Sequence, residues 1–319
     1  MPEKSVDVII PSYKPDMRFI SLLKRLVKQS VKPGKIIIIN TDKSEWEALG
    51  FGGIISESSE LLKACVIRHI KKSEFDHGRS RNFGVSLSDA DAFICMTQDA
   101  VPCSRHLIEN LISSLDNNVG ISYARQIPYK DAGLIERFTR RYNYPENSYI
   151  KSASDVEKYG IKLYFASNVC AAFDRKCFDK LGGFPEGLVL NEDMIYASRL
   201  IKSGGSIYYS SKACVYHSHE YSGFMQFKRN FDIGASQSAY SDVFSGFKSE
   251  GEGKRLVKKT ALYLAEHGAL YLLPKLFYIS LCKYAGYLMG KRYKKLPPAI
   301  IKMCGLNHTY WQNYLKRVL

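Results

Sequence analysis

Short apolar runs alternate with helical patterns through the first hundred residues, and this alternation constrains the fold more than any other feature. The apolar runs are residues 6–10, 35–39, 66–70 and 92–97. Their length and apolar content are typical of β-strands, whereas residues 17–29 and 79–88 carry helical patterns. Because strands that alternate with helices form βαβ units, the sequence predicts an α/β fold around a mostly parallel sheet.

The fourth apolar run ends in Gln98 and Asp99, and Pro102 follows closely. An acid placed where a buried strand leaves the sheet lies in the crevice beyond the strand's carboxyl end, where open α/β sheets bind ligands. Such an acid can meet a divalent metal and a diphosphate, but aspartate is also a common turn residue. The residues alone leave both interpretations of Asp99 open.

Three further motifs stand at a strand end or a helix start. Pro11, Ser12 and Tyr13 form a turn that can place backbone and an aromatic ring against a nucleobase, and Asp42 can accept a hydrogen bond from a base. Arg81 belongs to a pair of arginines at a predicted helix start, where they can meet phosphate. Ordinary turn chemistry is the alternative for the first two of these motifs.

Two downstream motifs add ionisable side chains. Glu192 and Asp193 follow Asn191, which is consistent with a capped helix N-terminus and also with a general base aimed into a cleft. His217 and His219 stand two residues apart near a predicted strand end, so both can approach one site. A lone histidine is usually structural, whereas two at this spacing favour metal binding.

The charge of the chain is concentrated at its C-terminal end. The 46 basic and 31 acidic residues give a net charge of +15, and residues 254–319 hold 13 Lys or Arg against one acid, Glu266. This basic tail predicts an anionic partner, either a membrane surface or nucleic acid. Helical patterns at 256–272 and 275–290 are interrupted by proline and lysine, so they indicate amphipathic helices lying on a membrane, not crossing it. Packing against the rest of the chain, or a homodimer interface, is the alternative.

Several classes of protein are disfavoured by motifs that the sequence lacks. Neither a Walker P-loop nor a GxGxxG pattern follows the first strand, which argues against kinases, ATPases and Rossmann dehydrogenases. No nucleic-acid recognition motif is present, so we expect no nucleic-acid partner. The eight cysteines form no CxxC pair, which indicates reduced thiols, and no signal peptide precedes the first strand, so a cytoplasmic location is expected.

Taken in order along the chain, these motifs resemble those of family 2 glycosyltransferases. The shared motifs are residues 8–13 (Val-Ile-Ile-Pro-Ser-Tyr), Asp42, residues 81–84 (Arg-Asn-Phe-Gly), residues 98–100 (Gln-Asp-Ala) and residues 191–193 (Asn-Glu-Asp). A narrower resemblance is to the bacterial rhamnosyltransferases of that family. It is carried by residues 97–100, 191–194, 217–222, 229–234 and 290–297, together with Tyr310 and Trp311. The resemblance covers most of the chain.

This resemblance implies the GT-A fold, a nucleotide-sugar donor and Mg²⁺ or Mn²⁺ as cofactor. By similarity, the donor-binding residues are Pro11, Ser12, Tyr13, Asp42, Arg81, Asn82 and Gln98. Asp99 corresponds to the last acid of the family's DxD metal motif, Gln98 replaces the preceding acid, and His217 or His219 completes the metal site. Asp193 matches the catalytic base, and Glu192 and Asn191 beside it are expected to orient the acceptor or cap the helix.

The resemblance also implies an inverting, metal-assisted single displacement that transfers L-rhamnose from dTDP-rhamnose. A UDP-hexose or UDP-HexNAc donor is the alternative within the same fold. The implied acceptor is a lipid-linked or cell-surface polysaccharide, so we expect the enzyme to be cytoplasmic and peripheral on the inner face of the plasma membrane. We expect a catalytic domain at 1–253, divided into a nucleotide-binding half (1–100) and an acceptor half (101–253), followed by a basic helical extension at 254–319.

Overall fold

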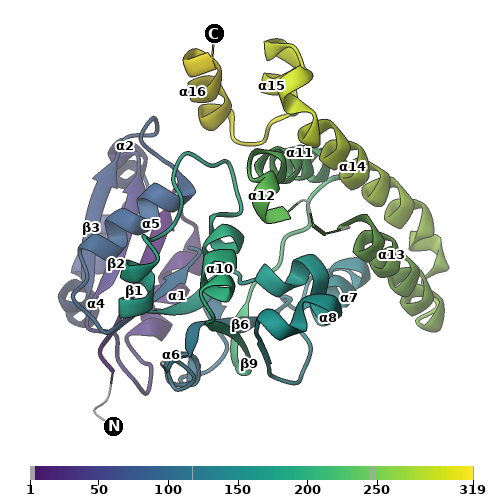
Figure 1. The fold of residues 1–319 in the computed structure, drawn as a ribbon. Coiled ribbons are helices and arrows are strands. Elements are labelled where there is room, and N and C mark those ends of the chain that lie inside the picture. The colour runs from purple at the N-terminus through teal and green to yellow at the C-terminus, as the bar shows by residue number, and fades with distance from the viewer. Residues whose placement is uncertain (1–3, 117, 245, 248, 319) are drawn as a thin grey trace.

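One nine-stranded sheet forms the centre of the computed structural model, which describes residues 4–116, 118–244, 246–247 and 249–318 (Figure 1). The strands are β1 (Val6–Ser12), β2 (Ile36–Thr41), β3 (Cys65–Ile70), β4 (Ala92–Met96), β5 (Val101–Pro102), β6 (Val119–Ile127), β7 (Tyr149–Lys151), β8 (Cys170–Asp174) and β9 (Ser206–Tyr216). Their spatial order is β3-β2-β1-β4-β8-β6-β9-β5, and β7 pairs with β9.

The pairing of the strands confirms the predicted mostly parallel sheet. β3, β2, β1 and β4 are mutually parallel, β8 runs antiparallel to both β4 and β6, and β6 is parallel to β9. β1, β2, β3, β4, β6 and β9 therefore all point the same way. Because parallel strands end at the same edge of a sheet, residues that follow these strands are brought together there.

Helices cover both faces of the sheet, as strands without a polar face require. Side chains alternate along β1, so that Val8 and Ile10 enter one core whereas Ile9 enters the other. The first core is covered by α1 (Met17–Leu26), α2 (Lys43–Ala48), α3 (Phe51–Ser56), α4 (Ser59–Ala64) and α6 (Leu107–Ile112). The second is covered by α5 (His77–Ser86), α9 (Arg175–Lys180), α10 (Glu192–Lys202) and α12 (Ser241–Phe244).

Two further apolar stretches of the sequence indicate strands, and the structure differs from both. The sequence at 164–173 predicts one strand with a polar break, but β8 begins only at Cys170 and the polar pair Ser167-Asn168 lies outside the sheet. Residues 207–209 and 213–216 predict two short strands, but they form one strand, β9, whose register against β6 shifts between Ala124 and Arg125. A bulge of this kind interrupts the ladder without ending the strand.

The C-terminal third of the chain is helical and lies beside the sheet and beyond its carboxyl edge (Figure 1). Its helices are α11 (Gly223–Ala239), α12, α13 (Ser249–Glu266), α14 (Leu273–Lys291), α15 (Pro298–Cys304) and α16 (His308–Val318), while α7 (Leu134–Asn143) and α8 (Val156–Tyr159) come earlier in the chain. The expected boundary between residues 253 and 254 falls inside α13. None of the helices in the described ranges is both long enough and apolar enough to cross a membrane.

Close packing joins α14 to α11, which lies before that boundary. Gly286 and Gly290 of α14 approach the carbonyl oxygens of Phe227 and Phe231, where any Cβ would overlap the α11 backbone. Glycine is required here because only a residue without a side chain lets two helix backbones come this near. The packing therefore groups α11 with the C-terminal helices, although the sequence pattern placed it with the catalytic part.

A buried acid of α11 fixes the last two helices. The Asp232 carboxylate accepts a hydrogen bond from the Trp311 indole N–H (2.7 Å) and from the backbone N–H groups of Leu306 and Asn307. Burial raises the pKa of Asp232 to about 6, and these donors partly offset that effect. α16 in turn reaches the loop after β3, where the Asn313 amide donates to the Ser73 carbonyl (3.3 Å).

Candidate active site

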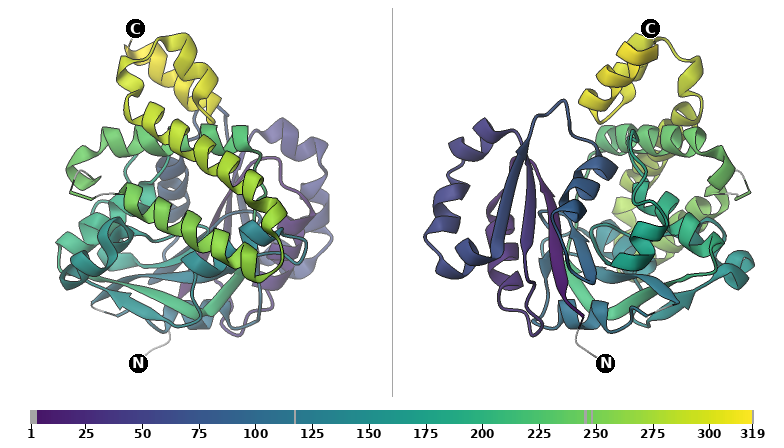
Figure 2. Two further views of the ribbon diagram at one scale, coloured as in Figure 1. Left: turned by 90° about the vertical axis from the view of Figure 1, so that its right-hand side faces the viewer. Right: turned by 60° about the vertical axis from the view of Figure 1, so that its left-hand side comes forward.

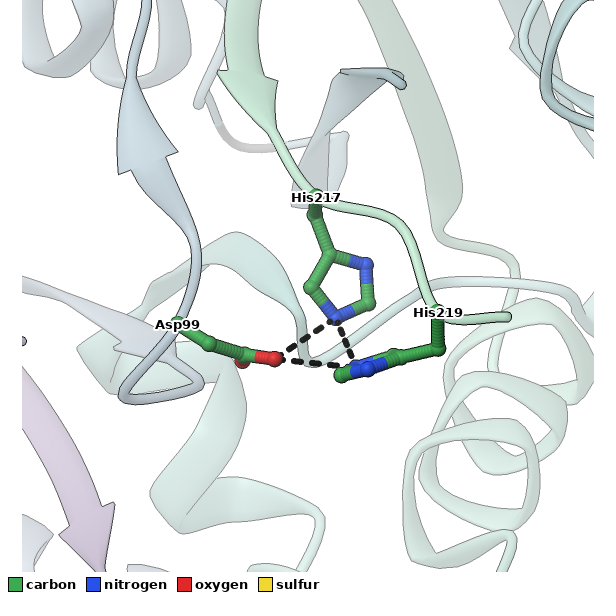
Figure 3. Close-up of side chains that lie close together, drawn as sticks. All are labelled: Asp99, His217 and His219. Carbon is green, nitrogen blue, oxygen red and sulfur yellow. Dashed lines mark hydrogen bonds and ion pairs between the residues drawn. The ribbon is translucent and has the colours of Figure 1, made fainter. Parts of the chain in front are cut away.

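Three side chains converge at the carboxyl edge of the sheet. Asp99 follows β4, whereas His217 and His219 follow β9 (Figure 3). The Asp99 Oδ2 atom lies 2.9 Å from His219 Nε2 and 3.5 Å from His217 Nε2, and the two Nε2 atoms are 3.1 Å apart. Within the described residues these three groups form a cluster that could hold a metal ion. The structure thus brings together all three metal-ligand candidates of the sequence.

A glutamine at the end of β6 fixes the orientation of His217. The Gln126 Oε1 atom accepts a hydrogen bond from His217 Nδ1–H (2.9 Å) and another from Arg140, while Gln126 Nε2 donates to Tyr144 Oη and to Ser167 Oγ. Because both ends of the amide are engaged, its oxygen faces His217, and the proton is placed on Nδ1. The lone pair of Nε2 is then directed into the cluster, as in a metal-binding histidine held by an outer partner.

The electrostatics favour the metal-binding forms of two of these groups. Burial opposes ionisation of Asp99, but the neighbouring imidazoles of His217 and His219 outweigh that effect and hold the pKa of the carboxyl well below its usual range. Burial also lowers the pKa of His217, which keeps its imidazole neutral at pH 7. Ionised carboxylate and neutral imidazole are the forms that bind metals.

The spacing of the cluster also fits a divalent ion. Ligands about 2.1 Å from one ion and at right angles to each other lie about 3.0 Å apart. The separations of 2.9, 3.1 and 3.5 Å match such a set, with room on the remaining side for other oxygen ligands. The residues present therefore fit a divalent metal, and their mixture of imidazole and carboxylate is typical of transition metals more than of Mg²⁺.

The first turn of α10 carries two acids that have different surroundings. Glu192 is buried and accepts from Arg81 Nη1 (3.0 Å) and from Asn168 Nδ2 (3.0 Å). Burial opposes its ionisation, but the charge of Arg81 leads the effects that leave the pKa of Glu192 lowered. Asp193 has no such cation partner, and burial, followed by the charge of Glu192, raises its pKa to about 7. A carboxyl poised near neutral pH is suited to general-base chemistry.

The segment from Ser167 to Val169 connects the acids of α10 with the metal cluster. The Asn168 backbone N–H donates to Asp193 Oδ2 (3.3 Å), and the Val169 carbonyl accepts from the N–H of Thr97, two residues before Asp99. Sequence analysis did not assign a role to this segment. Its signal was a polar Ser-Asn pair inside an otherwise apolar run, which is where the chain leaves the sheet.

The β1 and β4 ends are joined through Gln98, whose place in the family motif is that of an acid. Its Oε1 accepts from the Tyr13 backbone N–H (2.8 Å), and its Nε2 donates to the Tyr13 carbonyl (3.0 Å). Both ends of the Gln98 amide are therefore hydrogen-bonded to the loop after β1. The Nζ atom of Lys72 lies 5.4 Å from the centroid of the Tyr13 ring.

Buried hydroxyls at the ends of adjacent strands remain available to a ligand. Ser12 of β1, Thr41 of β2 and Thr97 after β4 have hydroxyl oxygens without a hydrogen-bond partner in the described parts of the chain. Pro11 lies in β1 directly before Ser12. Asp42, directly after β2, has a positive φ of 71° and accepts from Ser44 Oγ (2.6 Å). That hydrogen bond lowers the pKa of the exposed Asp42 carboxyl.

Three predicted site residues make contacts within the chain that the sequence pattern did not indicate. Arg81 is buried, and its guanidinium contacts the Glu192 carboxylate and the His77 carbonyl. The Asn82 side-chain amide accepts a hydrogen bond from the Phe184 backbone N–H and donates one to the Phe184 carbonyl, which holds the loop before α10 against α5. Asn191 occupies the position before α10 with φ 70° but makes no side-chain cap, since its Nδ2 has no partner among the described atoms.

Two solved structures share this architecture. A mannosyltransferase from Pyrobaculum calidifontis, PcManGT, in complex with GDP-Man and Mn²⁺ superposes with a TM-score of 0.56 at 16% identity, covering 98% of this chain and 87% of its own. S. aureus TarS in complex with UDP-GlcNAc gives a TM-score of 0.51 at 14% identity and covers 91% of both chains. The chain therefore has the GT-A fold.

Sequence comparison assigns the family. The model of "Glycosyl transferase family 2" matches residues 7–182. The O-antigen chain rhamnosyltransferase RfbN of Salmonella typhimurium is 33% identical over 312 residues, which is 97% of this chain and 96% of that protein. WbaN of Salmonella anatum, also an O-antigen chain rhamnosyltransferase, is 32% identical over 313 residues, which is 97% of this chain and 96% of WbaN. The chain belongs to glycosyl transferase family 2 and is a glycosyltransferase similar to rhamnosyltransferases.

Proposed function

We propose that this enzyme transfers L-rhamnose from dTDP-rhamnose to a growing polysaccharide with inversion at the anomeric carbon. The names of the two relatives that match nearly the whole chain support the sugar and the kind of acceptor. The observation that carries the mechanism is the contrast between two acids. Asp99 is held ionised among the histidines, whereas the pKa of Asp193 is raised to about 7. Two carboxyl groups whose pKa values are shifted in opposite directions are suited to different chemical roles.

In the proposed reaction, Asp193 removes the proton of an acceptor hydroxyl as that oxygen attacks the anomeric carbon. A new carbon–oxygen bond forms on the face opposite the bond to the diphosphate, and that bond breaks with its electron pair on the diphosphate. Burial and the negative charge of Glu192 keep the proton affinity of Asp193 high, and the ion pair with Arg81 keeps Glu192 itself ionised. The Asn168 backbone N–H orients the accepting carboxylate.

Asp99, His217 and His219 would hold the divalent cofactor at the other end of the site. A metal bound there supplies Lewis-acid stabilisation of the charge that develops on the leaving diphosphate. Two imidazoles and a single carboxylate favour Mn²⁺ over Mg²⁺, since Mg²⁺ prefers oxygen ligands. Tyr13, Asp42 and the free hydroxyls of Ser12 and Thr41 are the residues that we assign to the nucleotide.

The proposed place of action is the cytoplasmic side of the plasma membrane, where a lipid-linked acceptor would be elongated. Residues 254–319 contain 13 basic residues and one acid, which supports attraction to an anionic membrane. Residues 1–222 then form the donor and catalytic part, and the helices from α11 onward form the part that meets the acceptor and the membrane. A homodimer is the alternative role for these helices, and nucleic acid is not a proposed partner.

A donor screen tests this proposal. The full chain is incubated with dTDP-rhamnose, UDP-hexoses and UDP-HexNAc, each with Mn²⁺ or Mg²⁺, and nucleoside diphosphate release and thermal shift are measured. We expect dTDP-rhamnose with Mn²⁺ to give the largest shift and the fastest release. Preference for a UDP-sugar would replace the donor assignment, and no response to any nucleotide sugar would refute the transferase mechanism.

Asp99→Asn is the variant that tests the metal assignment in the same screen. The substitution keeps the size of the side chain but removes its charge, so we expect Mn²⁺ to bind more weakly and donor hydrolysis to lose its dependence on the ion. Glu109→Gln on α6 serves as a matched control, since this exposed acid also contacts a histidine, His106, but lies outside the site. Equal Mn²⁺ affinities in both variants would rule out the proposed metal cluster.

A further inference from the structure

The outward side of α14 and the turn before it expose an unusual number of large apolar side chains. Six of them are between 47% and 77% exposed: Leu270, Tyr271, Phe277, Tyr278, Leu281 and Tyr284. Single exposed apolar residues are normal, but a contiguous group of this kind marks an interaction surface. We call this group the α14 apolar face.

Helix geometry explains why the α14 apolar face is a single surface. Phe277, Leu281 and Tyr284 are spaced by four and three residues, so they lie on one side of the helix. The opposite side is already used, because Leu276 is buried and the two glycines, Gly286 and Gly290, pack on α11. α14 is thus apolar on both sides while only one is covered, and Figure 2 shows it on the outside of the molecule beside α13. A helix of this kind requires a further apolar partner.

Charge decides which partner fits. α14 carries three lysines, Lys275, Lys283 and Lys291, and no acid, so two copies apposed through this helix would bring like charges together. An anionic phospholipid surface instead provides both an apolar acyl-chain region and negatively charged headgroups. The residue types of α14 also favour a membrane, because tyrosine and lysine side chains are typical of the membrane–water interface. Phe224 of α11, with Lys228 Nζ 4.9 Å from its ring centroid, extends the same character.

We infer that the α14 apolar face is the surface by which this enzyme docks on an anionic phospholipid membrane. The inference rests on the proposed function only for the identity of the acceptor, and it names one helix face where the sequence indicated a whole basic tail. Docking places the aromatic and leucine side chains among the acyl chains near the headgroups and leaves the lysines at the phosphates.

The same surface is tied directly to the candidate active site. The Tyr278 ring packs against Gly223, the first residue of α11, where any Cβ would overlap it. Gly223 follows His219 by four positions in the chain, and four extended residues span at most about 14 Å. Within that link, the Tyr221 ring stacks on His219 with centroids 5.1 Å apart. A membrane-anchored acceptor beside α14 would therefore meet the site within a short distance of the headgroups.

Point substitutions test the inference better than truncation, because ending the chain near residue 253 cuts α13 and uncovers α11. The full-length double variant Phe277→Ser, Leu281→Ser removes two side chains that are 59% and 65% exposed and belong to none of the apolar cores formed by the described residues. Leu62→Ser on α4 is the matched control, since Leu62 is 58% exposed on another part of the molecule. Each protein is sedimented with vesicles of phosphatidylglycerol and phosphatidylcholine, and with phosphatidylcholine alone.

We expect the wild type and Leu62→Ser to bind the anionic vesicles and the double variant to bind them at least about tenfold more weakly. All three proteins should melt at similar temperatures and hydrolyse donor alike, so loss of vesicle binding is separable from failure of the transferase assignment. Equal binding by the double variant, or no binding by the wild type, would overturn the inference. A wild-type dimer that the double substitution dissociates, without vesicle binding, would assign the face to a second copy of the chain.

Discussion

The proton affinity of Asp193 leads to a prediction in which activity and stability change in opposite directions. Substituting Asp193→Asn removes the base but retains a side-chain oxygen that can accept from the Asn168 backbone N–H. Loss of a general base typically lowers turnover by about 10²- to 10⁴-fold. Donor binding should be retained, because the metal cluster and the β1 and β2 ends are unchanged.

The effect on stability follows from linkage between protonation and folding. The pKa of Asp193 is raised from 3.8 to about 7 in the folded protein, so the native state binds this proton more tightly than the unfolded chain does. The stabilisation is therefore complete at low pH and is lost as the pH rises from about 4 through 7. A shift of this size corresponds to up to about 4 kcal/mol, and the partial exposure of Asp193 to water reduces our expectation to about 2 kcal/mol.

Two measurements check this reasoning. The turnover number of the wild type should fall about tenfold from pH 8 to pH 6, because the base must be ionised. In urea unfolding at pH 8, Asp193→Asn should be more stable than the wild type, and the difference should vanish near pH 4. Glu60→Gln on the exposed surface of α4 controls for the change in net charge. A variant that kept turnover within fivefold of the wild type, or that was less stable at pH 8, would refute the general-base assignment.

Three further predictions concern neighbouring features. Gln126→Leu should weaken Mn²⁺ binding about 10- to 100-fold in an electron paramagnetic resonance titration without donor, and unchanged affinity would show that this amide does not orient the ligand. Arg81→Met should lower the free energy of unfolding by about 3–5 kcal/mol because it leaves Glu192 buried and unpaired, and a neutral result in urea unfolding would contradict that pairing. Gly290→Ala should cost about 1–3 kcal/mol in calorimetry, whereas Gly53→Ala, which has open space around it, should not; equal effects would argue against close helix contact.

The sequence predicted the sheet and the positions of the site where local pattern determines structure. Apolar runs defined β1 to β4, and the rule that parallel strands end at one edge placed Ser12, Asp42 and Asp99 together. The convergence of His217 with Asp99 was also predicted in outline. It is realised because β9, which precedes His217, pairs with β5, which directly follows Asp99.

The roles of side chains that pair across the fold could not be predicted in this way. Arg81 and Glu192 are more than a hundred residues apart in the sequence, so their ion pair is evident only from the fold. Gln126 looks like an ordinary strand residue until the β6–β9 pairing sets it beside His217. The expected boundary falls inside α13 for a similar reason, because composition shows where charge accumulates and not where helices begin or end.

The commitment of Gln98 to the Tyr13 backbone has a consequence for the order in which ligands bind. With a glutamine in place of one acid, the cluster contributes a single negative charge, so Asp99 and the two imidazoles would leave a bound divalent ion with one unit of positive charge. That residual charge would attract the donor diphosphate, whose oxygens would add to the ligands that the cluster supplies. Coupling between two ligands is reciprocal, so the nucleotide sugar should raise the affinity for the metal by the same factor as the metal raises affinity for the sugar. We expect the two to enter the site as a complex, with weak occupancy by either one alone.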